Sequence, residues 1–234
     1  MKINAGAYWD VGTRSLNEDS VLLQIVHSRK RDTVLALVAD GIGGLSEGHI
    51  ASGYVCEVMN ERFYREIVPL SDAGRSFGLL KRSLLRALYD IARELRAYAD
   101  DRQLRLGSTA AILLITGRRY MCVNLGDCRV YECLGDRIKS INEIHSLSPG
   151  SVSRCVGSFP YMEPDVYCGH IRGRTGFLLA SDGYYSLMDK DPYLFDPSKL
   201  RSDEIIEKRL YEIGSLIRKR GQQDNVSAIY LSCV

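Results

Sequence analysis

The stretch LVADGIGGLSEG, residues 37–48, joins the end of an apolar run to a glycine-rich turn and the start of a predicted helix. A single carboxylate, Asp40, closes the run where a buried strand would end. A buried carboxylate loses its hydration and needs a partner. Gly41, Gly43 and Gly44 would let the backbone approach an ion and expose a carbonyl to it, although an ordinary strand-to-helix turn favours glycine as well. The stretch therefore predicts either a cation site or a plain turn at the edge of a sheet.

The residues around this stretch predict a chain of the α+β class. The apolar, β-rich runs Val21–Val26 and Thr33–Ala39 indicate two strands joined by a charged turn. Residues Gly48–Ile67 are typical of a helix, and Leu79–Tyr98 carries apolar side chains at helical spacing. Strands occur in blocks with helices between the blocks, which favours α+β over an alternating βαβ order.

The second half of the chain consists mainly of predicted strands. Four short β-rich runs between residues 109 and 141 are separated by turn dipeptides, which predicts a meander of antiparallel strands. The run TGFLLA, residues 175–180, predicts another strand, Ser202–Lys219 predicts a helix, and NVSAIYLSCV closes the chain as a strand. Because neither a linker nor an internal repeat interrupts the sequence, we predict a single domain over residues 1–234.

The composition excludes several classes of partner. The formal net charge of +2 gives no reason to expect a nucleic-acid partner. No apolar run is long enough to cross a membrane, and the N-terminus lacks the apolar core of a signal peptide. Seven cysteines without a CxxC pair indicate reduced thiols in a cytoplasmic protein and argue against a structural zinc site.

Three further acids share the context of Asp40. Asp182 follows the apolar run GFLLAS, Asp224 precedes the last predicted strand, and Asp19 precedes the first. One acid at a strand end is usually a cap or turn former, but four in one domain indicate a cluster. Converging buried carboxylates need cations or take up protons, and oxygen ligands favour Mg²⁺ or Mn²⁺ over zinc or copper. Beside such a cluster, Arg14 is a candidate phosphate anchor because its fork is planar and permanently charged.

These residues lie in motifs that resemble the metal-dependent serine/threonine protein phosphatases, the PPM or type 2C family, and most closely its short, single-domain bacterial branch. The matching motifs are GTRSLNEDS, VADGIGG, GSTAAILLI, NLGDCRVY, EIHS, LLASDGYYSLM and QDNVSAIYL. They occur in family order from Gly12 to Leu231, so the resemblance covers nearly the whole chain. It implies a sandwich of two antiparallel β-sheets flanked by helices, with metal ions at one edge.

The resemblance also implies the ligands of two Mn²⁺ or Mg²⁺ ions. Asp40 would bridge the ions, and Gly41 would lend its carbonyl to one of them. Asp182 and Asp224 would bind the other ion directly.

Further residues would support these ligands and the substrate. Glu18 and Asp19 would act through metal-bound waters, Arg14 would hold the substrate phosphate, and Asn225 would orient Asp224. A water bridging the two ions would attack phosphorus of phosphoserine or phosphothreonine. The implied substrates are phosphoproteins, and the implied role is to oppose a serine/threonine kinase.

The sequence departs from the family pattern at several positions. Asp127, in NLGDCRVY, matches a position that helps to bind a third metal ion. Ser186 stands where some members carry another acid, so a third ion would be weakly held. Ile42 stands where eukaryotic relatives often carry a histidine proposed as general acid, so water would have to protonate the leaving group.

The flap that usually follows the HS motif is nearly absent. Only about six residues, LSPGSV, separate His145-Ser146 from the segment SRCVG. We therefore expect an open edge of the active site, with substrate choice resting on other loops. His145 itself is interpreted as a structural residue.

Three alternatives stay open from the sequence. Cys168 and Arg174 in CGHIRGRT have the C-x5-R-[ST] spacing of cysteine-dependent phosphatases. That chemistry needs a loop that opens a helix, whereas GRTG predicts a hairpin turn into a strand. A phosphatase-like module that binds partners without turnover is disfavoured because Asp40, Asp182 and Asp224 are all present. Hydrolysis of small phosphoesters would use the same site chemistry.

Overall fold

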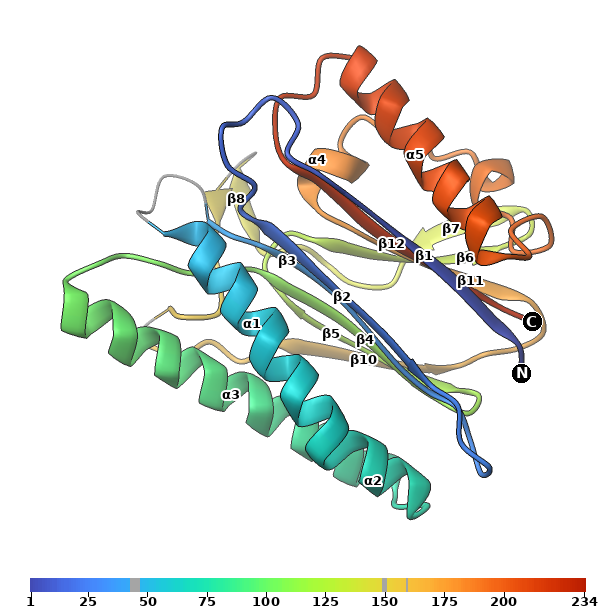
Figure 1. The fold of residues 1–234 in the computed structure, drawn as a ribbon, viewed down its shortest axis with the longest axis horizontal. Coiled ribbons are helices and arrows are strands. Elements are labelled where there is room, and N and C mark those ends of the chain that lie inside the picture. The colour runs from blue at the N-terminus through green and yellow to red at the C-terminus, as the bar shows by residue number, and fades with distance from the viewer. Residues whose placement is uncertain (43–46, 149–150, 159) are drawn as a thin grey trace.

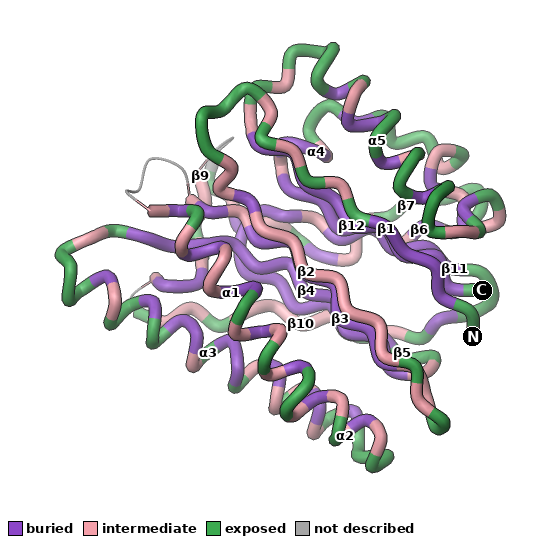
Figure 2. The backbone as a smooth tube through the Cα atoms, in the orientation of Figure 1, coloured by how far each residue is buried: buried purple, intermediate pink, exposed green. Residues whose placement is uncertain are grey.

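The computed structural model describes residues 1–42, 47–148, 151–158 and 160–234. Within these ranges two five-stranded antiparallel sheets stack face to face, and helices cover the outer face of each sheet (Figure 1). Figure 2 shows that the strands between the helical layers are mostly buried, whereas exposed residues gather on the outer sides of the helices and in connections. The predicted α+β sandwich is confirmed.

The first sheet has the strand order β10-β5-β4-β3-β2. Its strands are β2 (Asp19–Val26), β3 (Thr33–Asp40), β4 (Ala110–Thr116), β5 (Arg119–Leu125) and β10 (Asp165–His170). Successive side chains of a strand point to opposite faces, so Leu37 packs under the helices while Val38 faces the second sheet. Because both faces are covered, β3 is a continuous buried run up to Asp40.

The second sheet has the strand order β1-β12-β11-β6-β7. Its strands are β1 (Ile3–Asp10), β6 (Arg129–Leu134), β7 (Arg137–Ser140), β11 (Thr175–Ala180) and β12 (Val226–Cys233). Its outer face is covered by α5 (Asp203–Lys219), together with the short α4 (Asp182–Tyr185) and the 3₁₀ turn η2 (Pro192–Phe195). A third, two-stranded sheet pairs β8 (Ser146–Ser148) with β9 (Ser151–Val152).

The helical layer over the first sheet consists of two long helical segments. The first is α1 (Gly48–Arg62), continued by the π-helical turn η1 (Phe63–Ile67) and by α2 (Val68–Asp72), so it runs further than the predicted Gly48–Ile67. Pro69 has no N–H, so the regular helical hydrogen-bond pattern is interrupted where α2 continues from η1. In the described part of the chain, no helix combines the length and the apolar character needed to cross a bilayer.

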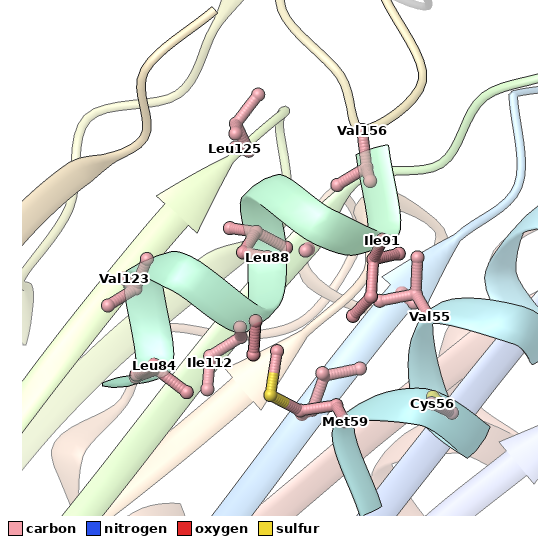
Figure 3. Close-up of a cluster of buried hydrophobic side chains, with 14 of the residues drawn as sticks. Val55, Cys56, Met59, Leu84, Leu88, Ile91, Ile112, Val123, Leu125 and Val156 are labelled. Carbon is pink, nitrogen blue, oxygen red and sulfur yellow. The ribbon is translucent and has the colours of Figure 1, made fainter. Parts of the chain in front are cut away.

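Helix α3 (Phe77–Arg102) packs against α1. Its buried side chains, with those of α1 and the first sheet, form the largest hydrophobic cluster of the described residues. The helix begins where the Ser76 hydroxyl accepts a hydrogen bond from the Leu79 N–H, and it ends at Gln103, whose φ of 55° is left-handed. Leu88 of α3 is fully buried in the cluster that Figure 3 shows between the two helices and the sheet. The apolar spacing that predicted this helix therefore marks the face that the helix buries.

The predicted meander is wrong at its middle: β4 pairs with β5 and β6 pairs with β7, but β5 and β6 lie in different sheets. The chain changes sheet at residues 126–128. Gly126 has a φ of +116°, and a Cβ there would lie 2.5 Å from the Cβ of Thr109, so only glycine fits this crossover. The dipeptide Gly135-Asp136 makes an ordinary hairpin between β6 and β7. The same Gly-Asp dipeptide therefore forms a crossover between sheets at 126–127 and a hairpin turn at 135–136.

The hairpin predicted at GRTG is also wrong. β10 pairs with β5 in the first sheet, whereas β11 pairs with β6 and β12 in the second. The residues between them, 171–174, therefore carry the chain from one sheet to the other. Strand β1 is missing from the sequence-based prediction because INAGAYWD has no clear alternation, and its pairing with β12 joins the two ends of the chain.

Several segment ends meet at one end of the sandwich. Asp40 ends β3 directly opposite Asp19, which begins β2. The crossover at 126–128 leaves β5 at this same end, because β5 pairs with β4 and β4 with β3. β11 ends at Ala180, opposite Ala228 near the start of β12. The topology therefore gathers residues that are far apart in the sequence.

Replacing Leu88 by alanine should lower the free energy of unfolding by about 2–5 kcal/mol, because a fully buried leucine leaves a cavity. Urea unfolding followed by circular dichroism measures the change. Arg82→Ala on the exposed side of the same helix should change stability by no more than about 0.5 kcal/mol. Equal losses in the two variants would contradict the assignment of this core.

Candidate active site

A cavity of about 200 Å³ opens at the end of the sandwich where these segments meet. Four of the residues that line it are acids predicted from the sequence, and one is the predicted phosphate anchor. The lining residues are Arg14, Asp40, Ile42, Thr109, Asp127, Val152, Asp182 and Asp224. The acids come from four different segments, so the cavity exists only in the folded chain.

Asp40 is held by its backbone, which leaves its carboxylate to face the cavity. Its N–H donates to the Thr109 hydroxyl at 2.8 Å, and its carbonyl accepts the Thr109 N–H at 2.8 Å. Asp19, opposite it, is only 2% exposed, and its Oδ2 finds no hydrogen-bond partner among the described residues. The Asp19 carbonyl accepts the indole N–H of Trp9 at 2.8 Å. Thr109 and Trp9 are contacts that the sequence did not predict.

Asp182 and Asp224 are brought together by close backbone packing. Asp182 is the first residue of α4, directly after β11. A Cβ on Gly183 would lie 1.9 Å from the carbonyl oxygen of Asn225, so glycine is required for α4 to approach the start of β12. Asp224 is fixed by the Asn225 N–H, which donates to its Oδ1 at 2.9 Å.

Arg14 lies at the mouth of the cavity, with 54% of its side chain exposed. Its Nη2 donates to Asp224 Oδ2 at 3.1 Å. The Asn225 side chain organises the loop that carries Arg14: its Nδ2 donates to the carbonyls of Val11 and Leu16, and its Oδ1 accepts the Glu18 N–H. Asn225 therefore ties this loop to β12 as well as lying beside Asp224.

Asp127 reaches the cavity from the crossover between the sheets. It is 5% exposed, and within the described ranges its Oδ1 has no hydrogen-bond partner. One carboxylate oxygen each of Asp40 and Asp127 and the Sγ of Cys128 lie within 4.8 Å of one another. Cys128 is fully buried and shares a hydrogen bond with the Thr109 hydroxyl. No pattern in the sequence marks Cys128 apart from its place beside Asp127.

The acids raise one another's proton affinity. Burial, together with the charges of Asp182 and Asp224, raises the pKa of Asp19 to about 7. Burial and then the charges of Asp127 and Asp224 raise the pKa of Asp182 to about 6. Burial, followed by the charge of Asp19, holds the pKa of Asp40 well above its usual range. A fully ionised cluster is therefore unfavourable unless positive charge enters it.

Gly41 and Glu18 lie beside this cluster, next to the start of α1. The Gly41 N–H donates to the Glu18 carbonyl at 3.0 Å, and a Cβ on Gly41 would lie 2.3 Å from the carbonyl oxygen of Gly48. Close backbone approach thus requires glycine at position 41. Gly43 and Gly44, which we expected to serve the same purpose, lie outside the described residues.

The rim of the cavity carries apolar side chains. Ile42 and Val152 line it, and Val152 belongs to the β8–β9 pair. Leu147, in the same pair, is 82% exposed. Of the short segment LSPGSV, residues 149–150 lie outside the described ranges.

The structure does not assemble a cysteine-based site around Cys168. Cys168 lies exposed within strand β10, opposite Met121 of β5, and Arg174 lies in the connection that changes sheet. A phosphate-binding cysteine loop opens a helix, whose amides and dipole hold the anion. The segment that follows Arg174 is strand β11, so the spacing of Cys168 and Arg174 is a coincidence.

Comparisons with known proteins agree with this fold. A family model described as Protein phosphatase 2C matches residues 11–212. A serine/threonine phosphatase stp from Listeria innocua is 21% identical over 225 residues, which cover 87% of this chain and 86% of the relative. The crystal structure of the serine/threonine phosphatase Stp1 from Staphylococcus aureus superposes with a TM-score of 0.83 at 22% identity, covering 100% of this chain and 96% of that one. PppA, a key regulatory component of T6SS in Pseudomonas aeruginosa, gives a TM-score of 0.79 at 26% identity, covering 99% and 97%.

The family match spans most of the chain, and the structural likeness extends over all of it. The resemblance inferred from the seven motifs is therefore confirmed. The chain belongs to the protein phosphatase 2C family of metal-dependent serine/threonine protein phosphatases.

Proposed function

We propose that the acidic cavity is the catalytic centre and that it hydrolyses phosphoserine and phosphothreonine with two Mn²⁺ or Mg²⁺ ions and a weakly held third. One observation carries the proposal. Four aspartates line one small cavity with an arginine at its mouth, and a fifth lies buried beside it, opposite Asp40. The five are Asp19, Asp40, Asp127, Asp182 and Asp224.

The donor set suits hard divalent ions. Buried oxygens of Asp19 and Asp127 lack hydrogen-bond partners among the described residues, so they are free to accept a cation or a metal-bound water. Carboxylate and carbonyl oxygens are the ligands that Mg²⁺ and Mn²⁺ prefer. Asp40 and Gly41 would serve one ion, and Asp182 and Asp224 the other, with Glu18 acting through water. Asp127 would hold the third.

Divalent ions, when bound, would neutralise phosphate charge and lower the pKa of water enough to supply the nucleophile. Arg14 would bind the phosphate through its planar fork, and it stands half-exposed at the mouth where the substrate enters. When Arg14 binds phosphate, Asp224 would lose its hydrogen bond from Arg14 and would be free to bind a metal ion. Arg14 is the one basic side chain among the described residues that line the cavity, so we infer that the leaving oxygen takes its proton from solvent.

The shape of the rim supports a protein substrate. The short β8–β9 pair stands in place of a flap, and Ile42 and Val152 border the opening. A phosphorylated residue within an extended peptide could approach such an edge. We infer that the enzyme reverses the action of a serine/threonine kinase and works in the cytoplasm, without nucleic-acid or membrane partners.

Hydrolysis of a phosphothreonine peptide tests the chemistry directly. We expect activity that requires Mn²⁺ or Mg²⁺ and stops with EDTA. Asp40→Asn should lower kcat by about a hundredfold or more, because electrostatic stabilisation at the reacting phosphate is lost. Cys168→Ser should leave the rate unchanged. Activity that ignores EDTA and vanishes with Cys168→Ser would refute the proposal.

The phosphate anchor gives a second test. Arg14→Ala should lower kcat/KM about ten- to a hundredfold, since a hydrogen bond to a charged group contributes roughly 1.5–3 kcal/mol. Steady-state kinetics at saturating Mn²⁺ measures the loss, and the exposed Arg82→Ala on α3 serves as control. If Arg14→Ala matched the control, phosphate would have to be held elsewhere.

Protonation of the cluster predicts how stability depends on pH without metal. Between about pH 4 and about pH 7, Asp19 ionises in the unfolded chain but stays protonated in the folded one, so its contribution to stability falls as pH rises. Asparagine cannot ionise. In EDTA, the stability advantage of Asp19→Asn over the wild type should therefore grow across this range and level off above it.

Thermal unfolding of both proteins at several pH values measures this difference. Carboxylates elsewhere, such as Asp165 with its lowered pKa, contribute equally to the two proteins and cancel. Added Mn²⁺ should remove the advantage of the variant. A difference that stays constant with pH would contradict the raised pKa of Asp19.

A further inference from the structure

The ring of His145 links an acid on β10 to the crossover that carries Asp127. His145 is 7% exposed, and its Nε2 lies 3.0 Å from Asp165 Oδ2. On the other side of the ring, the Gly126 N–H donates to Nδ1 at 3.1 Å. Both ring nitrogens are therefore engaged, and the ring spans the gap between β10 and the crossover.

These two contacts fix the tautomer of His145. Because Nδ1 accepts the Gly126 N–H, it carries no hydrogen, so the neutral ring has its proton on Nε2 and donates it to Asp165. Asp165 is held in turn by Arg154, at 3.4 Å from its Oδ1, and by the Tyr167 hydroxyl at 3.4 Å from Oδ2. A carboxylate that accepts the ring N–H of a histidine commonly fixes both the tautomer and the orientation of that ring.

The same histidine also holds the backbone of Gly126. The His145 N–H donates to the Gly126 carbonyl at 2.9 Å, and Asn124 Nδ2 donates to the same carbonyl at 3.1 Å. Gly126 thus has both its N–H and its C=O bound by His145, at a φ of +116° that the chain would not otherwise favour. The next residue is Asp127, and its backbone carbonyl accepts a hydrogen bond from the Tyr185 hydroxyl at 3.1 Å.

We propose that His145, oriented by Asp165, is a positioning residue that fixes Gly126 and thereby points the Asp127 carboxylate into the metal site. The inference rests on the proposed function, in which Asp127 holds the third and weakest ion. Asp127 Oδ1 is buried without a hydrogen-bond partner among the described residues, so the backbone that carries Asp127 helps to set the direction of its carboxylate. The His145–Asp165 pair should therefore govern the ion at Asp127 and leave the ions at Asp40, Asp182 and Asp224 unaffected.

Substitutions can separate the two contacts of the ring. His145→Asn keeps an acceptor near the place of Nδ1 but loses Asp165, whereas His145→Ala loses both and leaves the Gly126 N–H without its acceptor. Asp165→Asn can present a donor to Nε2 and so favour the wrong tautomer, with a hydrogen on Nδ1 facing the Gly126 N–H. Asp165→Ala removes the partner without that conflict.

The experiment counts the Mn²⁺ bound per 234-residue chain by EPR of the free ion. We expect the wild type to bind two Mn²⁺ ions tightly, at Asp40, Asp182 and Asp224, and a third weakly, at Asp127. The two events are called the tight steps and the weak step. His145→Ala and Asp165→Asn should weaken the last step about ten- to a hundredfold and leave the tight steps unchanged. Asp165→Ala and His145→Asn should have smaller effects. Phosphatase assays should show a matching rise in the Mn²⁺ concentration needed for half-maximal rate.

A matched control separates this role from ordinary stabilisation. Ser71 makes buried hydrogen bonds to Thr33 and Thr116 at the opposite end of β3 from Asp40. Ser71→Ala should lower the free energy of unfolding by breaking these bonds, yet leave the Mn²⁺ isotherm unchanged. His145→Asn and Asp165→Ala keep the test possible if His145→Ala fails to fold.

A double-mutant cycle completes the test. Asp127→Asn should abolish the weak step, and adding His145→Asn to it should change Mn²⁺ binding no further. Additive effects, or an unchanged isotherm in both His145→Ala and Asp165→Asn, would overturn the inference while leaving the proposed function intact. A wild-type protein that bound no Mn²⁺ would overturn the proposed function, and the inference with it.

Discussion

The repulsion among carboxylates at one end of the sandwich is the constraint on which this structure depends. Asp19 and Asp40 face each other across two paired strands, and Asp127, Asp182 and Asp224 close in from the second sheet and its connections. Burial and mutual charge raise the pKa values of most of these groups. Rigid backbone contacts elsewhere must hold the acids together before any cation arrives, and the two covered sheets supply that rigidity.

Glycines and small polar side chains make the convergence possible. Gly41, Gly126 and Gly183 each stand where a Cβ would strike neighbouring atoms, and each precedes or follows a residue of the cavity. Thr109 and Asn225 then satisfy backbone groups that the departing strands leave free. Close approach of backbone segments therefore determines where the carboxylates of the cavity lie.

The sequence predicted the α+β class, the long amphipathic helix and the acids because these leave local signals: apolar runs, helical spacing and acids at the ends of the runs. The sandwich was implied by the family resemblance. It did not predict which strands pair. GD at 126–127 and GRTG at 173–176 look like hairpin turns, but both connections change sheet, because the deciding contacts come from Thr109 and from strands distant in the sequence. For the same reason the contacts of His145 could not be predicted, because its partner Asp165 lies on a strand that no local pattern revealed.

The chain has one tryptophan, and its indole N–H is bound to the carbonyl of Asp19. Trp9 is 56% exposed, yet this hydrogen bond anchors its indole to the backbone of Asp19, a residue that is only 2% exposed. The field at the indole must change whenever the acids gain or lose charge. Its fluorescence emission should therefore report, without a label, whether the acids of the cavity are ionised, protonated or neutralised by a cation. Because the chain has a single tryptophan, the emission comes from this one position.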